Sequence, residues 1–235
     1  MRRGSQPSFR IQAWSVYEER GWLVSGGRRS AGFNRGSSSQ GWDRLAETAA
    51  VACGPQQGGL GHPPGFHHLQ EGLALYKRSY DGYKVCSGPE SHGALTELNY
   101  IGSVLMKLGR AKEAVPLLEN ALPAWRRVAG SSPELSEALY FLARAYVQTG
   151  RFADGEKLAK ELVAIQEGKV APTDRRFGIS HLVWAEALVG QHRYQEALPH
   201  AEIAEKLLAN AISPGALSMK AEAHNVLIEI QSNIH

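Results

Sequence analysis

Nine histidines and two cysteines are the side chains of this sequence best suited to metal binding or catalysis. His62, His67 and His68 are clustered in the segment His-Pro-Pro-Gly-Phe-His-His. Cys53 or Cys86 could be added to them as metal ligands. A structural zinc site needs ligands at regular spacing, and this Gly/Pro-rich segment offers no pair of ligands one helical turn apart. We therefore expect no metal site here.

The sequence offers equally few residues for catalysis or phosphate binding. Four histidines in the C-terminal half are scattered with respect to any serine, cysteine or carboxylate that could complete a nucleophile and base pair: His181, His192, His200 and His224. The glycines form no Gly-x-x-x-x-Gly-Lys-Ser/Thr phosphate loop. The sequence thus predicts a protein that is not an enzyme and uses no cofactor.

Charge and hydropathy narrow the choice of partners. A formal charge of +3 is too small to indicate a nucleic-acid-binding protein. The basic excess lies in residues 1–42, with seven arginines and two acidic residues. Arginine pairs such as Arg28-Arg29 could attract phosphate or form a kinase site, but a solvated tail is the preferred interpretation. No apolar run is long enough to span a membrane. With only two cysteines, a reducing compartment and hence the cytoplasm are predicted.

The chain divides by composition into a leader and a helical part. Residues 1–42 are dense in Gly, Ser and Arg and are predicted to be disordered, although three tryptophans leave a small folded element open. Residues 43–93 are expected to hold a short helix at Asp43 to Ala52, a Gly/Pro-rich loop, and a helix from about Phe66 to Val85. Hydrophobic spacing typical of helices continues to the C-terminus.

Internal repetition is the strongest signal in the sequence. Three stretches, residues 102–122, 143–163 and 185–205, can be superposed at intervals of 41 and 42 residues. Each has a small residue within a first helix and another twelve residues later, where two antiparallel helices can approach closely. These pairs are Gly102 and Ala114, Ala143 and Gly155, and Ala185 and Ala197.

Turn residues separate the expected helices. Gly109 and Gly150 suit a left-handed helix C-cap within two of the hairpins. The third hairpin has His192 at that place, so Gly190 is expected to supply the break. Between hairpins, prolines such as Pro133 and Pro214 fall near the first turn of the next helix, where the missing N–H costs little.

This spacing, with the pattern Leu-Gly-Arg-x-x-Glu-Ala at residues 108–114, resembles tetratricopeptide repeats, in particular the 42-residue variety of kinesin light chains and many bacterial proteins. The resemblance implies an all-α fold, an α-solenoid of stacked antiparallel helix pairs wound as a right-handed superhelix. It implies three hairpins in residues 94–212 and a capping helix in residues 213–235. Residues 43–93 then contain a degenerate half-repeat.

The resemblance also implies a concave groove lined by the first helix of each hairpin. The groove-facing positions become Thr96, Asn99, Ser103 and Met106, then Glu137, Tyr140, Arg144 and Val147, and finally Ile179, Leu182, Glu186 and Val189. Asn99 and Arg144 are the preferred ligand contacts, because an amide bonds a peptide backbone and a guanidinium grips a carboxylate. For Tyr140, Leu182 and Val189, packing between repeats is the alternative. The lysine of a clamp for a chaperone tail is missing.

Two functions follow as hypotheses. The first is a protein-interaction adaptor that binds a peptide or partner helix in this groove. The alternative is a regulatory or sensory fragment of a larger signalling protein, a kinase or transcriptional regulator, whose catalytic domain lies elsewhere. Self-association through the final helix is a third idea, based on its apolar residues Leu217, Val226, Leu227, Ile228 and Ile230.

Overall fold

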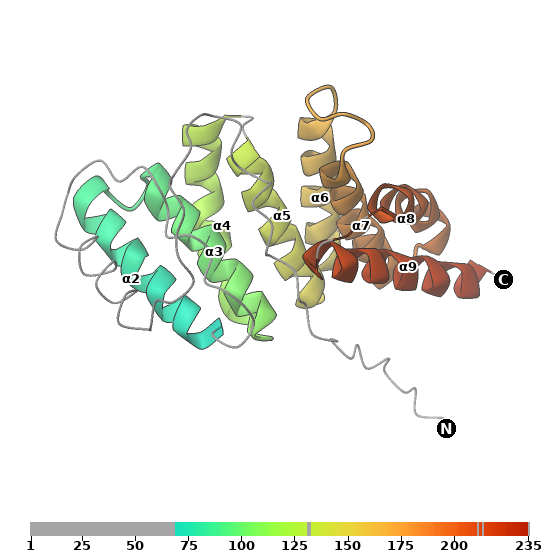
Figure 1. The fold of residues 1–235 in the computed structure, drawn as a ribbon, viewed down its shortest axis with the longest axis horizontal. Coiled ribbons are helices and arrows are strands. Elements are labelled where there is room, and N and C mark those ends of the chain that lie inside the picture. The colour runs from blue at the N-terminus through green and yellow to red at the C-terminus, as the bar shows by residue number, and fades with distance from the viewer. Residues whose placement is uncertain (1–68, 131–132, 211, 213, 235) are drawn as a thin grey trace.

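The computed structural model describes residues 69–130, 133–210, 212 and 214–234, which contain eight helices and no strand. The helices are stacked side by side from one end of the molecule to the other (Figure 1). Their bounds are α2 Leu69–Ser87, α3 His92–Lys107, α4 Ala111–Ala129, α5 Pro133–Gln148, α6 Phe152–Gln166, α7 Arg175–Gly190, α8 Tyr194–Leu208 and α9 Pro214–Ile234. The predicted all-α solenoid is confirmed. The predicted leader of residues 1–42, the helix at 43–52, the Gly/Pro-rich loop and the histidine cluster lie outside the described residues.

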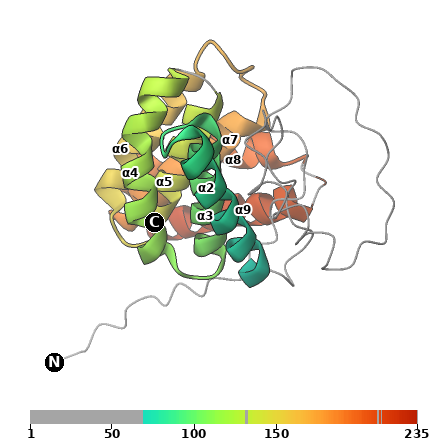
Figure 2. The same ribbon diagram turned by 90° about the vertical axis from the view of Figure 1, so that its left-hand side faces the viewer.

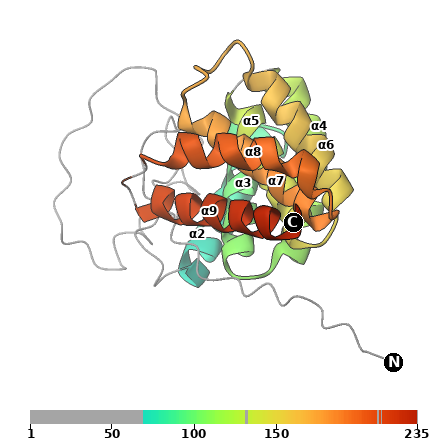
Figure 3. The same ribbon diagram turned by 90° about the vertical axis from the view of Figure 1, so that its right-hand side faces the viewer.

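The packing pattern makes the stack curved. Each helix contacts the next one along the chain, and α3, α5, α7 and α9 also contact one another in series. The helices α4, α6 and α8 make no corresponding backbone contacts with each other. Because only the first helices of the hairpins approach closely, they form the inner, concave face of the array. Views toward its two ends show α2 and α3 in front at one end and α8 and α9 in front at the other (Figures 2 and 3).

The small residues that defined the repeats are buried where the paired helices meet. Ala114, Ala143, Ala185 and Ala197 are completely inaccessible to solvent. Larger side chains fill the space around these points and form one continuous core that extends from Leu73 to Ile230.

One expectation about the turns was wrong. Gly109 and Gly150 adopt left-handed conformations, with φ of +73° and +80°, as predicted. In the third hairpin His192 itself adopts φ +60°, whereas Gly190 is the last residue of α7. A Cβ atom at Gly190 would lie 2.2 Å from Cδ1 of Phe152. Gly190 is therefore needed for close approach to α6 and does not break the helix.

Helix starts follow local rules. The side chains of Ser91 and Asp174 cap α3 and α7 by accepting hydrogen bonds from backbone N–H groups. Pro133 and Pro214 begin α5 and α9. The second helices begin after an arginine that pairs with an acidic residue three positions later: Arg110 with Glu113, Arg151 with Asp154, and Arg193 with Glu196.

Two of these arginines also join successive hairpins. Arg151 lies 2.7 Å from Glu119 of α4, and Arg193 lies 2.6 Å from Glu156 of α6. A third ion pair, between Arg126 of α4 and Glu161 of α6, spans 2.7 Å. The outer edge of the array is thus connected by side-chain ion pairs.

Candidate functional site

A small hollow lies between the inner helices α3 and α5. It is lined by Ser103, Met106 and Lys107 from α3 and by Tyr140, Phe141, Arg144 and Gln148 from α5. The other α5 residues lie three or four positions from Arg144, so they share one face of that helix. Four predicted groove residues, Ser103, Met106, Tyr140 and Arg144, are brought together here.

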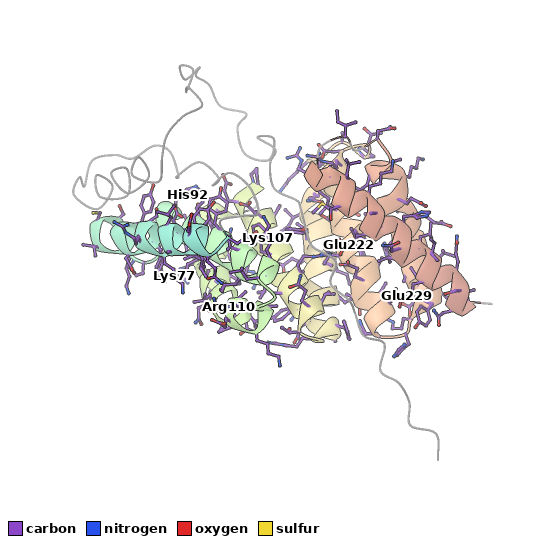
Figure 4. All side chains as sticks on the ribbon, turned by 60° about the horizontal axis from the view of Figure 1, so that its bottom comes forward. Lys77, His92, Lys107, Arg110, Glu222 and Glu229 are labelled. Atoms are coloured by element: carbon purple, nitrogen blue, oxygen red, sulfur yellow. The ribbon has the colours of Figure 1, made fainter. Side chains whose placement is uncertain are left out.

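Arg144 connects the hollow to the rest of the inner face. Its Nη1 donates a hydrogen bond to Oε2 of Glu186 on α7, and its Nη2 donates to Oε1 of Glu222 on α9 at 2.9 Å. Figure 4 labels Glu222 on α9 and Lys107 on α3. The side chains of this Arg144 triad are 5%, 11% and 23% exposed, in the order Arg144, Glu186, Glu222. Three successive inner helices are therefore linked by one buried guanidinium.

The triad contains two carboxyl groups for one cation. Burial raises the pKa of Glu222 well above its usual range, Arg144 lowers it, and the nearby Glu186 raises it again. The group carries a net charge of about −1 when both acids are ionised and is neutral when one of them holds a proton.

Glu137 is a third carboxyl group on this face. It lies on α5 one turn before Tyr140 and Phe141, and the residue is 8% exposed. Within the described parts of the chain it accepts no hydrogen bond and forms no ion pair. Burial, with a smaller contribution from Glu134, raises the pKa of Glu137 to about 7. Tyr100 of α3 lies close enough for its own pKa to be raised in part by Glu137.

The other predicted positions of the first repeat lie elsewhere. Asn99 is completely buried, and its Oδ1 accepts a hydrogen bond of 3.3 Å from Nε1 of Trp125. Its Nδ2 has no partner among the described residues. Thr96 is half-buried and donates to the His92 carbonyl at 2.8 Å. Asn99 therefore lies beneath the surface of the inner face and is paired within its own hairpin.

The second and third repeats place their remaining predicted residues nearer the core. Val147 is half-buried. Ile179, Leu182 and Val189 are 2%, 1% and 5% exposed and belong to the hydrophobic core. Glu186 is the position of the third repeat that joins the polar part of the inner face, through Arg144.

Comparison with known proteins identifies a repeat family over part of the chain. Residues 94–168 match the family model described as "Tetratricopeptide repeat". This part of the chain resembles tetratricopeptide repeats. Two solved structures of a candidate kinesin light chain from Podosopora anserina, with nearly identical TPR-like repeats, superpose with a TM-score of 0.56 at 18% identity. One of them carries a point substitution, and the matches cover 83% of this chain and 94% or 93% of those chains. No curated protein matches the sequence.

Tetratricopeptide repeats are generally protein–protein interaction modules and typically non-catalytic scaffolds. The predicted resemblance to kinesin-light-chain repeats is confirmed. Among the described helices, none combines the length and apolar character that crossing a membrane requires.

Glu222 is a residue of the inner face that was not predicted from the sequence. It follows Ala221 as Glu186 follows Ala185, but Ala221 is exposed whereas Ala185 is completely buried. Arg144 is 42 residues from Glu186 and 78 from Glu222, so the last interval is 78 − 42 = 36 residues. The interval is shorter because α9 starts five residues after its connection begins at Ala209, and Glu222 lies only eight residues into the helix. The Ala-Glu pair alone was a weak signal, because it also occurs at Ala201-Glu202 and Ala204-Glu205.

The final helix, α9, is amphipathic, which corrects the residue set proposed for self-association. Val226, Leu227 and Ile230 are 9%, 8% and 0% exposed and belong to the core of the array. Leu217 and Ile228, about half exposed, are the members of the set that face solvent.

Two of the scattered histidines meet in the third hairpin. Nδ1 of His181 and Nδ1 of His200 are 2.8 Å apart, and Trp184 stacks on His200 with ring centroids 3.8 Å apart. Burial, followed by the effect of His200, lowers the pKa of His181 to about 4. No group of three His, Cys, Asp or Glu side chains suitable for a metal ion occurs in the described residues.

Proposed function

We propose that this chain is a scaffold or adaptor whose concave face binds a peptide or a partner helix of another protein. The observation that supports this function is the hollow between α3 and α5, where side chains from successive repeats converge. Extended concave surfaces lined by repeated helices are well suited to peptides and amphipathic helices. We further propose that it acts in the cytoplasm, in keeping with its low cysteine content.

The lining of the hollow suits a ligand of mixed character. Met106, Tyr140 and Phe141 offer apolar and aromatic surface for an inserted side chain. Ser103 and Gln148 add hydroxyl and amide groups that can bond a peptide backbone. The hollow is small, so one or two ligand side chains would enter it while the rest of the segment lies along the inner face.

Peptide display on the intact chain tests this function. Peptides would be selected for binding to the wild-type protein, and their affinity for the Gln148→Trp variant would then be measured. The tryptophan fills the hollow from a half-buried position at its rim. The matched control is Lys157→Trp, which adds the same side chain at an exposed position of α6. Thermal unfolding would establish that both variants fold.

The proposal expects peptides that lose at least tenfold in affinity for Gln148→Trp and keep their affinity for Lys157→Trp. Failure to select any peptide, or equal binding to both variants, would reject binding at this face.

A further inference from the structure

The unusual group on the inner face is Glu137. A carboxylate that is removed from water normally accepts hydrogen bonds or lies beside a cation, because its desolvation is otherwise uncompensated. Only 8% of Glu137 is exposed, and it has no donor within the described part of the chain, so its carboxyl oxygens depend on a small opening to solvent. Its pKa, raised mainly by burial, is the expected mark of a carboxyl group without a cation.

Glu137 lies along the same face of α5 as the residues of the hollow. Positions 137, 141, 144 and 148 are separated by four, three and four residues, which places them in one row on the helix. Phe141, Arg144 and Gln148 line the hollow, so Glu137 lies at one end of that row. Tyr100 of α3 lies close enough to Glu137 for this carboxyl group to raise the pKa of Tyr100 in part.

The surrounding charges do not satisfy Glu137. Its nearest charged neighbour on α5 is Glu134, which repels it. Arg144 is committed to Glu186 and Glu222. Lys107 of α3, whose pKa is lowered by burial, is the other cation of the hollow. Among the described residues, four carboxyl groups thus stand against two cations along this part of the inner face.

We infer that Glu137 is the contact for an arginine side chain of the peptide partner, whose guanidinium enters between α3 and α5. This inference rests on the proposed function and specifies its partner: a segment that presents an arginine to the concave face. A guanidinium fits better than an ammonium, because it pairs with a carboxylate through two parallel hydrogen bonds. Charge complementarity supplies the argument for this occupant.

The test uses fluorescein-labelled hexa-arginine, hexa-lysine and hexa-citrulline with the intact chain, followed by fluorescence anisotropy. Citrulline has nearly the shape of arginine without its charge. Glu137→Gln removes the carboxylate while keeping the size of the side chain. Glu202→Gln removes the same charge from an exposed position of α8 and serves as the matched control.

Hexa-arginine is expected to bind at least tenfold more tightly than hexa-citrulline and several-fold more tightly than hexa-lysine. Glu137→Gln should weaken hexa-arginine binding at least tenfold, and Glu202→Gln should change it less than twofold. Equal losses in the two variants would mean general charge attraction and overturn the inference. Equal affinity for hexa-lysine would overturn the preference for arginine.

The outcome is separable from that of the proposed function. Display peptides that are sensitive to Gln148→Trp but indifferent to Glu137→Gln would leave peptide binding in place and reject the arginine contact. Absence of any peptide that responds to Gln148→Trp would reject peptide binding at the hollow itself.

Discussion

Replacement of Arg144 by methionine should destabilise the array by about 3–5 kcal/mol, because it leaves two carboxyl groups without their shared cation. The side chains of Arg144 and Glu186 are 5% and 11% exposed, so water can replace little of the lost interaction. The control is Arg126→Met, which breaks an ion pair whose partners are 47% and 31% exposed. That change should cost at most about 1 kcal/mol.

The sign of the pH dependence gives a second criterion. Without Arg144, which lowers the pKa of Glu222, that pKa in the folded state should rise further above the value in the unfolded chain. Folding then takes up protons, so stability falls as pH rises between the unfolded and folded pKa values. The destabilisation by Arg144→Met should therefore be smaller at pH 5 than at pH 7.5.

Urea denaturation followed by circular dichroism at both pH values measures these quantities. A triple variant with Arg144→Met, Glu186→Leu and Glu222→Leu should recover most of the loss, because apolar residues of similar volume can replace a buried ion group. A loss under about 1 kcal/mol for Arg144→Met at pH 7.5, or a loss that does not depend on pH, would refute the account of the triad.

Three further predictions concern stability and can be checked by urea denaturation. His192→Gly should stabilise the array by about 0.5–1 kcal/mol, since φ +60° is strained for histidine; a lower midpoint would contradict this. Burial raises the pKa of Glu97 to about 7, so wild-type stability should fall as pH rises from 4.5 to 7; Glu97→Gln should remove that part of the slope. Burial lowers the pKa of His181 to about 4, so its contribution should be lost as pH falls from 6.5 to 4; His181→Leu should flatten this dependence, and an unchanged profile would count against it.

Sequence alone was sufficient for features governed by local rules that recur in each repeat. The prolines that start α5 and α9 and the glycines of two turns act within a few residues of their own position. The small residues such as Gly102 act within their own hairpin. Their recurrence at intervals near 42 residues therefore predicted the hairpins. His192 departed from the pattern because a histidine accepted the backbone conformation that glycine adopts in the other two turns.

The partners of the groove residues could not be predicted in the same way. Arg144 was expected to grip a carboxylate of a ligand, whereas the structure pairs it with Glu186 and Glu222 of its own chain. That pairing depends on the adjacency of α5, α7 and α9. It also depends on the interval between Glu186 and Glu222, which is shorter than a full repeat. Asn99 depends likewise on Trp125, which lies 26 residues away. Side-chain pairing across repeats requires three-dimensional register that a repeat pattern does not supply.

The unequal edges of the stack have a mechanical consequence. The inner edge is closed by direct contacts among α3, α5, α7 and α9, whereas α4, α6 and α8 are connected by exposed ion pairs such as Arg151 with Glu119. Tightly packed helices resist compression, and exposed ion pairs weaken as salt screens them. We therefore expect the inner edge of the array to be stiffer than the outer edge. We also expect raised ionic strength to weaken the connections of the outer edge more than the packed contacts of the inner edge.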